Sequence, residues 1–171
     1  LPGVTQQQVN DWIGHGTRTL LIQALAYAGD TSVETVRQSD SLVLIAAEFD
    51  KHYQRRCGTR SHLYPQVREV LHALRGQGVK LAVVTNKESR YTDAVLGAHD
   101  LTRLFDRVIS GDSLSAKKPD PAGIHSCLEQ FEVERERALF VGDSSIDVAT
   151  ARNAGVQVWA LPYGYNMGEP I

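Results

Sequence analysis

Long apolar runs and blocks of like charge are both missing from this 171-residue sequence. No segment approaches the roughly 18 apolar residues that a membrane-spanning helix needs, so we expect no membrane partner. The 18 basic and 20 acidic residues are interspersed, with a net charge of −2, and this balance predicts no nucleic-acid partner. The opening residues 1–4 lack the basic and apolar regions of a secretion signal, and we expect a cytoplasmic protein.

Metal-binding and disulfide patterns are missing as well. The two cysteines, Cys57 and Cys127, lie far apart and have no companions, so we expect free thiols in a reducing compartment. The six histidines show none of the paired spacings of a zinc site. Nothing in the composition distinguishes a monomer from a homodimer, and both remain expected.

The first half of the chain, residues 1–62, contains no convincing strand. Apolar residues fall at helical spacing over residues 20–28, and the Gly-Asp-Thr at residues 29–31 is typical of a helix end followed by a cap. The apolar residues from Val33 to Tyr53 are again at helical spacing and predict further helix. We therefore expect an all-helical domain over residues 1–62.

The second half, residues 63–171, alternates between helices and strands. Helical patterns cover residues 67–74, 88–96, 122–131 and 146–154. Short apolar runs typical of buried parallel strands cover residues 79–85, 108–110, 138–142 and 156–161. This alternation predicts a doubly wound, Rossmann-like α/β domain with a parallel sheet.

Two polar clusters lie where such sheets bind ligands, at the carboxyl ends of strands. Thr85 and Asn86 directly follow an apolar strand, where a hydroxyl can donate to a phosphate oxygen and the next helix offers free N–H groups. Lys117 and Lys118 precede the Pro-Asp-Pro at residues 119–121, which suits a helix start and can hold an ammonium over an anion. Taken alone, each cluster is equally typical of a helix cap or of solvated surface charge.

A third cluster, Gly-Asp-Ser-Ser-Ile-Asp at residues 142–147, also follows an apolar strand. Asp143 lies at the strand end and Asp147 one helical turn later, so the two carboxylates can converge. Converging carboxylates raise each other's proton affinity unless a cation lies between them, and Mg²⁺ prefers such oxygen ligands. The alternative is that Asp143 only caps the helix. Together the three clusters supply a hydroxyl, a cation and two acids, the set that phosphoryl transfer requires.

These clusters resemble the motifs of a known family. Val-Val-Thr-Asn at residues 83–86, Lys-Lys-Pro-Asp-Pro at 117–121 and Gly-Asp-Ser-Ser-Ile-Asp at 142–147 are similar to motifs II, III and IV of the haloacid dehalogenase superfamily. The resemblance implies a Rossmann-like core over residues 63–171 and an all-helical cap of the C1 type over residues 1–62.

The resemblance also assigns roles to single residues. It implies that Thr85 and Asn86 bind the transferring phosphoryl group and that Lys118, which directly precedes the proline, stabilises it. Asp143 and Asp147 are expected to hold Mg²⁺. Lys117 is expected to be a solvated neighbour.

Two short elements narrow the resemblance to bacterial phosphoglycolate phosphatases. Trp-Ile-Gly-His-Gly at residues 12–16 resembles a Trp-Ile-Gly-Asn-Gly element of their cap, and Tyr-Gly-Tyr-Asn at 163–166 is also similar to that subgroup. His15 stands where asparagine is usual, and it is a candidate, with Arg18, for contact with the substrate. Beside this turn, Arg18 is the only fixed cation, and we predict that it grips a substrate carboxylate. The alternative is a solvent-facing arginine on an amphipathic helix.

One motif of the superfamily is missing. Motif I is Asp-x-Asp-x-Thr at the end of the first core strand and carries the nucleophile and the general acid/base, but no Asp-x-Asp occurs in this sequence. The first residue is Leu1 and the only methionine is Met167. We therefore expect an internal fragment of a longer protein, with the first core strand missing and the core incomplete at both ends. A natural pseudoenzyme is the alternative.

The expected activity of the parent protein is Mg²⁺-dependent hydrolysis of a small phosphorylated metabolite, 2-phosphoglycolate first, through an aspartyl-phosphate. A pyrophosphatase or a sugar-phosphate phosphatase keeps the same motifs with another substrate. A phosphonate hydrolase would need a cap lysine, and the only one, Lys51, lies within a predicted helix. The alternative outside the enzymes is a noncatalytic phosphate-binding module. Because the chain as it stands has no nucleophile, we expect it to be inactive by itself.

Overall fold

The helical half of the protein forms a small bundle in the computed structural model, which describes residues 3–166 and 169–171. Its helices are α1 (Gln6–Trp12), α2 (Thr17–Ala28), α3 (Val33–Arg37) and α4 (Leu42–Arg56). The buried apolar side chains that hold the bundle together are Leu21, Ile22, Ala26, Val36 and Leu42. This cluster packs α2 against α3 and the start of α4, as the apolar spacing predicts.

The helical pattern from Val33 to Tyr53 is not one helix. It breaks into α3 and α4 at residues 38–41, where the hydroxyl groups of Ser39 and Ser41 hydrogen-bond to each other at 2.7 Å. Serine and aspartate side chains compete with the backbone for hydrogen bonds and so favour turns over helix interiors. The apolar periodicity alone does not register this interruption.

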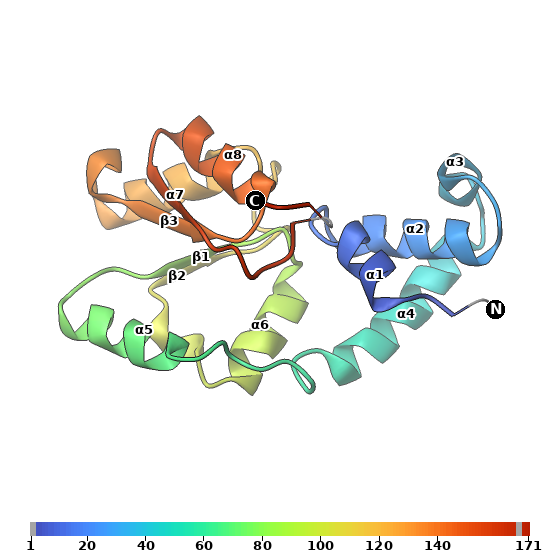
Figure 1. Cartoon of the computed structure of the whole chain (residues 1–171), viewed down its shortest axis with the longest axis horizontal. Helices are drawn as coiled ribbons and strands as arrows, with labels where there is room; N and C mark the ends of the chain where they lie inside the picture. The colour runs from blue at the N-terminus through green and yellow to red at the C-terminus, as the bar shows by residue number, and fades with distance from the viewer. Residues whose placement is uncertain (1–2, 167–168) are drawn as a thin grey trace.

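The second half contains all four strands that the described residues form. The strands are β1 (Ala82–Val84), β2 (Arg107–Ile109), β3 (Leu139–Gly142) and β4 (Gln157–Ala160). The helices between them are α5 (Val67–Gly76), α6 (Ser89–Ala98), α7 (Ala122–Phe131) and α8 (Ser145–Ala154), with short 3₁₀ turns at Thr102–Leu104 and Arg135–Arg137. Figure 1 shows α7 and α8 above the strands and α5 and α6 below them, so helices lie on both faces as in a doubly wound fold.

The strands form two parallel pairs rather than one sheet. β1 pairs with β2, with Val83 opposite Val108, and β3 pairs with β4, with Val141 opposite Trp159. Within the described residues no hydrogen-bonded ladder joins β1 to β3. One face of the second pair packs on α7 and α8 through Phe140 and Val158, whereas Val141 and Trp159 on the other face are exposed. The parallel α/β class is therefore confirmed, and the single predicted sheet is divided.

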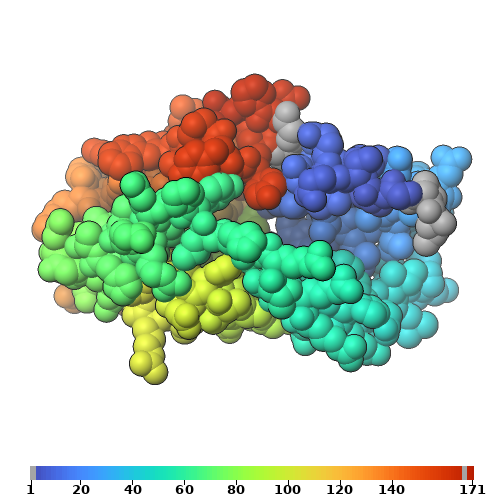
Figure 2. All heavy atoms as spheres, turned by 60° about the horizontal axis from the view of Figure 1, so that its bottom comes forward, coloured from blue at the N-terminus to red at the C-terminus, as the bar shows by residue number. Residues whose placement is uncertain are grey.

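The helical bundle contacts the α/β part along α4 and α6 (Figure 2, where the end of α4 is teal and α6 is yellow-green). Asp50 of α4 accepts hydrogen bonds from Arg90, at 3.0 Å, and from the hydroxyl of Tyr91. Burial, together with that hydrogen bond to Asp50, raises the pKa of Tyr91 well above its ordinary value. Nearby, Lys87 donates to the hydroxyl of Tyr53 at 2.9 Å. These contacts fix the bundle beside the carboxyl end of β1.

None of the described helices is long and apolar enough to cross a membrane.

Candidate active site

The predicted phosphate-binding hydroxyl, Thr85, lies at the carboxyl end of β1. Its backbone N–H extends the pairing with β2 by donating to the carbonyl of Ile109 at 2.9 Å. Its side-chain oxygen accepts from the N–H of Lys87 at 3.1 Å, which turns the chain toward α6. The hydroxyl hydrogen of Thr85 has no acceptor within the described part of the chain, so it is available to a ligand oxygen.

Asn86 is only 7% exposed, and its side chain is occupied by backbone groups. Its Nδ2 donates to the carbonyls of Gly14 at 3.1 Å and Lys118 at 3.0 Å, and its Oδ1 accepts from the N–H of Lys118 at 2.9 Å. In this arrangement the side chain has no N–H left for a phosphoryl oxygen. Its predicted role in phosphate binding would therefore fall to its backbone N–H, which has no partner within the described residues.

Lys118 is directed toward the acidic cluster at the end of β3. Its Nζ lies 2.6 Å from Oδ1 of Asp147, and only 14% of the lysine side chain and 6% of the aspartate side chain are exposed. The ammonium also lies 5.7 Å from the centre of the Phe140 ring. The peptide between Lys118 and Pro119 is cis, a detail the sequence pattern does not predict. The cation expected from the Lys-Lys-Pro-Asp-Pro motif is thus held by a buried acid.

Asp147 has both carboxylate oxygens engaged. Its Oδ2 accepts from the N–H groups of Asp143 and Ser144, at 3.1 and 3.0 Å, and from the Ser144 hydroxyl at 2.7 Å. Ser144 in turn accepts from the N–H of Asp147, which completes a capping box at the start of α8. Burial acts to raise the pKa of Asp147, but the Lys118 ammonium and the hydrogen bonds from Ser144 and Asp143 hold it below its ordinary value. Asp147 is therefore ionised at neutral pH.

Asp143 is half-buried at the same strand end, and the segment at residues 163–166 folds over it. Its Oδ2 accepts from the N–H of Tyr165 at 2.9 Å, while Ser145 donates its N–H to the side chain of Asn166 at 2.7 Å. A Cβ at Gly164 would lie 2.0 Å from the Cβ of Asp143, so only glycine allows this approach. The sequence resemblance singled out this segment, but it did not reveal the contact with Asp143.

Asp143 and Asp147 differ in the carboxylate oxygens that they can offer to a divalent cation. Asp143 keeps one carboxylate oxygen without a hydrogen-bond partner among the residues that the structure describes, as a magnesium ligand requires, whereas both oxygens of Asp147 are bound to Lys118 and to the start of α8. Within residues 3–166 and 169–171 no three acidic, histidine or cysteine side chains are grouped to hold a metal. The residues present fit a cation bound through Asp143 and completed by ligands from outside this set. The pairing of Asp143 with Asp147 as ligands stays a prediction.

The turn at residues 14–16 lies against these groups, but the two cap residues predicted to touch substrate are both exposed. His15 and Arg18 have no side-chain partner in the described part of the chain. Lys117, in contrast, reaches this turn, because its Nζ would lie 3.7 Å from a Cβ placed on Gly16. Its proximity to the turn was missed, since a lysine pair in sequence gives no direction for either side chain.

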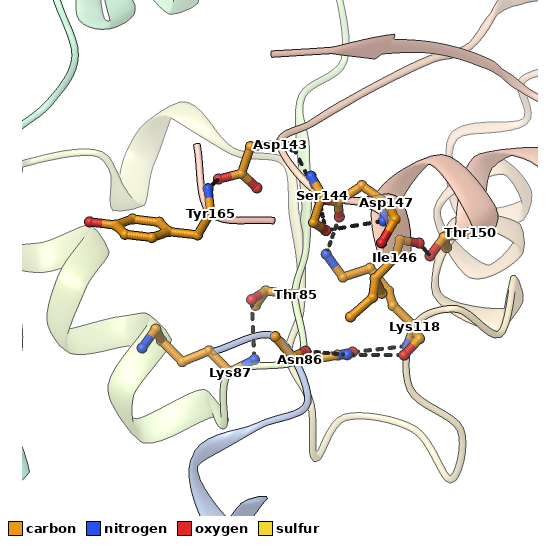
Figure 3. A network of polar contacts seen from close by, with 12 residues as sticks. Thr85, Asn86, Lys87, Lys118, Asp143, Ser144, Ile146, Asp147, Thr150 and Tyr165 are labelled. Atoms are coloured by element: carbon orange, nitrogen blue, oxygen red, sulfur yellow. Dashed lines mark hydrogen bonds and ion pairs between the residues drawn. The ribbon is translucent and has the colours of Figure 1, made fainter. Parts of the chain in front are cut away.

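Thr85, Lys118 and Asp143 surround one region near the carboxyl ends of β1 and β3, with Asn86 below Thr85 and Asp147 beside the end of Lys118 in the view of Figure 3. A hydroxyl, an ammonium and a carboxylate near the strand ends of a parallel α/β protein are the kinds of group that a phosphoryl-binding site uses. The chain belongs to the haloacid dehalogenase-like hydrolase family, whose family model matches residues 3–161.

Several relatives of the chain within this family carry the same, more specific name. A phosphoglycolate phosphatase of Vibrio vulnificus (strain YJ016) is 42% identical over 171 residues, covering 99% of this chain and 74% of that protein. A phosphoglycolate phosphatase of Aliivibrio fischeri is 40% identical over 174 residues, with 99% and 74% covered. A crystal structure described as a predicted phosphoglycolate phosphatase of Haemophilus somnus 129PT superposes with a TM-score of 0.91 at 34% identity, covering 100% of this chain and 76% of that one.

Proposed function

We propose that the protein supplies most of a Mg²⁺-dependent phosphomonoester hydrolase that converts 2-phosphoglycolate to glycolate and phosphate. The observation that carries this proposal is the convergence of Thr85 at the end of β1, Asp143 at the end of β3 and Lys118 from the loop before α7. The named relatives support the choice of substrate, since they match nearly the whole chain under the name phosphoglycolate phosphatase.

The side chains have separable tasks in this proposal. Thr85 donates its free hydroxyl hydrogen to a phosphoryl oxygen, which orients the group at the end of β1. Lys118 neutralises the charge that develops on the phosphoryl oxygens, and its ion pair with Asp147 keeps the ammonium in place before substrate arrives. Asp143 is the carboxylate that holds the cation. A bound Mg²⁺ would supply electrophilic stabilisation of the phosphoryl oxygens.

The nucleophile is proposed to come from residues outside this sequence. β1 and β3 each keep one edge without a hydrogen-bonded neighbour within the described residues. Unpaired strand edges are templates for a further strand. A strand that carries the family's Asp-x-Asp between β1 and β3 would place its carboxylates beside Thr85 and Asp143. An aspartate there would accept the phosphoryl group, and water would then hydrolyse the aspartyl-phosphate.

Phosphate release from a panel of substrates tests this function. In a chain that includes the Asp-x-Asp segment, 2-phosphoglycolate is expected to be hydrolysed with a higher kcat/KM than pyrophosphate or a hexose phosphate, and only with Mg²⁺. A preference for pyrophosphate or a sugar phosphate would show that the proposed substrate is wrong, while the reaction would still be hydrolysis of a phosphate compound. The 171-residue chain by itself is expected to release no phosphate. Turnover by this chain would contradict the assignment of the nucleophile.

A noncatalytic phosphate-binding module is the second candidate, and the lack of any Asp-x-Asp in this sequence favours it for the chain as it stands. Binding of inorganic phosphate by the 171-residue chain, measured by calorimetry, combined with no turnover in the extended chain, would support it.

A further inference from the structure

The Asn86 side chain joins three segments that are far apart in sequence. It follows β1. Its amide group hydrogen-bonds to Gly14 in the turn at residues 14–16, called the cap turn below, and to both backbone groups of Lys118 in the loop before α7. A carboxamide has two N–H donors, and both are used here on carbonyl oxygens. Its oxygen faces an N–H, so only one orientation of the amide satisfies all three contacts. The buried Asn86 is therefore a connector between the cap turn and the lysine loop.

The backbone of Asn86 lies close to Gly111 on one side. A Cβ on Gly111 would lie 2.2 Å from the Asn86 carbonyl oxygen, and a Cβ on Gly16 would lie 3.6 Å from the same atom. The residue thus lies between the cap turn on one side and the loop after β2 on the other. Because the main chain cannot move toward Gly111, we expect a displacement of the cap turn to act on the side-chain amide.

A separate contact also holds the turn on the core. The hydroxyl of Thr17, at the first position of α2, donates to the carboxylate of Glu88 at 2.7 Å. This bond does not involve Asn86 and can be removed without altering the amide. The neighbouring Thr19 offers a matched control, because its hydroxyl donates to His15 within the cap, at 3.3 Å, and not to the core.

We propose that Asn86 is a positioning residue that couples closure of the cap turn to the placement of Lys118. With the turn seated, the Gly14 carbonyl holds one N–H of the amide, and the amide holds both backbone groups of Lys118. When the turn lifts, that N–H loses its acceptor, the amide can rotate, and the lysine loop loses its two hydrogen bonds. Lys118 is then fully placed only under a closed cap. This inference rests on the proposed function for the chemical role of Lys118, but the coupling itself is a property of the fold.

Hydrogen exchange of the 171-residue chain tests the coupling without any catalysis. Thr17→Val should speed exchange in residues 14–19 and also, by at least about threefold, at the Lys118 amide, because local opening is transmitted through Asn86. Thr19→Val should leave the Lys118 amide unchanged. In an Asn86→Ala background, where the Lys118 amide already lacks its acceptor, Thr17→Val should add no further change there.

Asn86→Asp provides a second perturbation, since its carboxylate would face the carbonyls of Gly14 and Lys118 with an acceptor in place of a donor. It should speed exchange in residues 14–19 and at Lys118 together. Faster exchange of the cap turn with an unchanged Lys118 amide, in Thr17→Val or in Asn86→Asp, would overturn the proposal. So would the absence of any loosening of the turn in both variants, because the amide would then not hold it.

Kinetics of the chain that includes the Asp-x-Asp segment separates this role from simple loss of structure. Asn86→Asp should lower kcat by about 10²-fold with little change in KM, since it withdraws a preorganised charge from the transition state. Adding Lys118→Ala to it should cost far less than Lys118→Ala costs alone, because the two residues act as a unit. Additive losses would contradict the coupling. If the unsubstituted chain shows no turnover, the proposed function fails while the exchange result still decides the coupling.

Discussion

The strand ends and the cap turn contribute to the same site in different ways. At the strand ends, the groups that hold Lys118 are buried and each has several partners, as Asp147 shows with four hydrogen bonds to its two oxygens. In the cap turn, His15 and Arg18 are exposed and have no side-chain partner within the described residues. The residues proposed to bind the phosphoryl group are thus held by buried contacts of the core, whereas the two residues expected to read the substrate are exposed. Substitutions at the strand ends and in the cap turn should therefore differ in the property that they change as well as in the size of the effect.

The largest expected effect is on stability at the strand ends. Asp147→Asn should lower the free energy of unfolding by about 3 kcal/mol near neutral pH, because Lys118 would be left buried without its partner. The folded-state pKa of Asp147 is lowered, so its contribution is present above its unfolded pKa of about 3.9 and is lost as the pH falls through the folded value. Urea unfolding of both proteins at a series of pH values measures this. A difference that persists undiminished below about pH 3 would show that the ion pair is not its source.

Activity should separate the two lysines. In the chain that includes the Asp-x-Asp segment, Lys118→Ala should lower kcat by about 10²-fold or more, the scale for removal of one preorganised donor. Lys117→Ala should have a much smaller effect on kcat, because its ammonium lies beside the cap turn and not on Asp147. Equal losses of kcat in the two variants would contradict the separate roles assigned to Lys118 in the core and Lys117 beside the cap turn.

The contact between the segment at residues 163–166 and Asp143 can be broken by one methyl group. Gly164→Ala should weaken Mg²⁺ binding by about tenfold, since it displaces the N–H of Tyr165 that orients the Asp143 carboxylate. Gly97→Ala is the control, because a Cβ there meets no atom within 4 Å. Mg²⁺ titration by calorimetry gives both affinities. Unchanged Mg²⁺ affinity in Gly164→Ala would show that Asp143 does not depend on this segment.

The smallest effect is expected in the cap. Arg18→Ala should raise KM for 2-phosphoglycolate by roughly threefold to tenfold, as for one exposed charged contact, and hardly change hydrolysis of p-nitrophenyl phosphate, which has no carboxylate. Arg37→Ala, an exposed arginine on α3, is the matched control. Parallel losses on both substrates would indicate general damage to the cap. Unchanged kinetics on both substrates would show that Arg18 faces solvent and does not contact the substrate.

The sequence predicts the parallel α/β class, the helical half and the order of the elements well, because apolar periodicity records burial directly. The helix at Ala122–Phe131 is predicted to the residue. The same pattern overstates β1, since residues 79–81 are apolar or flank apolar positions but lie outside the hydrogen-bonded strand. It also runs through the break between α3 and α4, where side-chain hydrogen bonds among serines decide the backbone.

The polar motifs predict which residues gather at the strand ends, but not which of their atoms remain free. Asp143 and Asp147 look equivalent in sequence, and only the structure shows that Asp147 is bound to Lys118, while one oxygen of Asp143 has no partner among the described residues. Asn86 similarly appears as a ligand-binding residue, although its amide is used on backbone groups from two distant segments. Such partners are set by tertiary contacts, for which a local motif holds no information.

The place where α4 leaves the bundle is held closely against α6. Gly58 follows α4 with a φ of 81°, and a Cβ there would lie 2.8 Å from the Cβ of Ala98 on α6. The thiol of Cys57 also donates to the carbonyl of Tyr91, at 3.5 Å. These contacts at the base of the helical bundle are separate from those that hold the turn at residues 14–16 on Asn86 and Glu88. Loss of the turn's contacts therefore does not by itself require the base of the bundle to unpack.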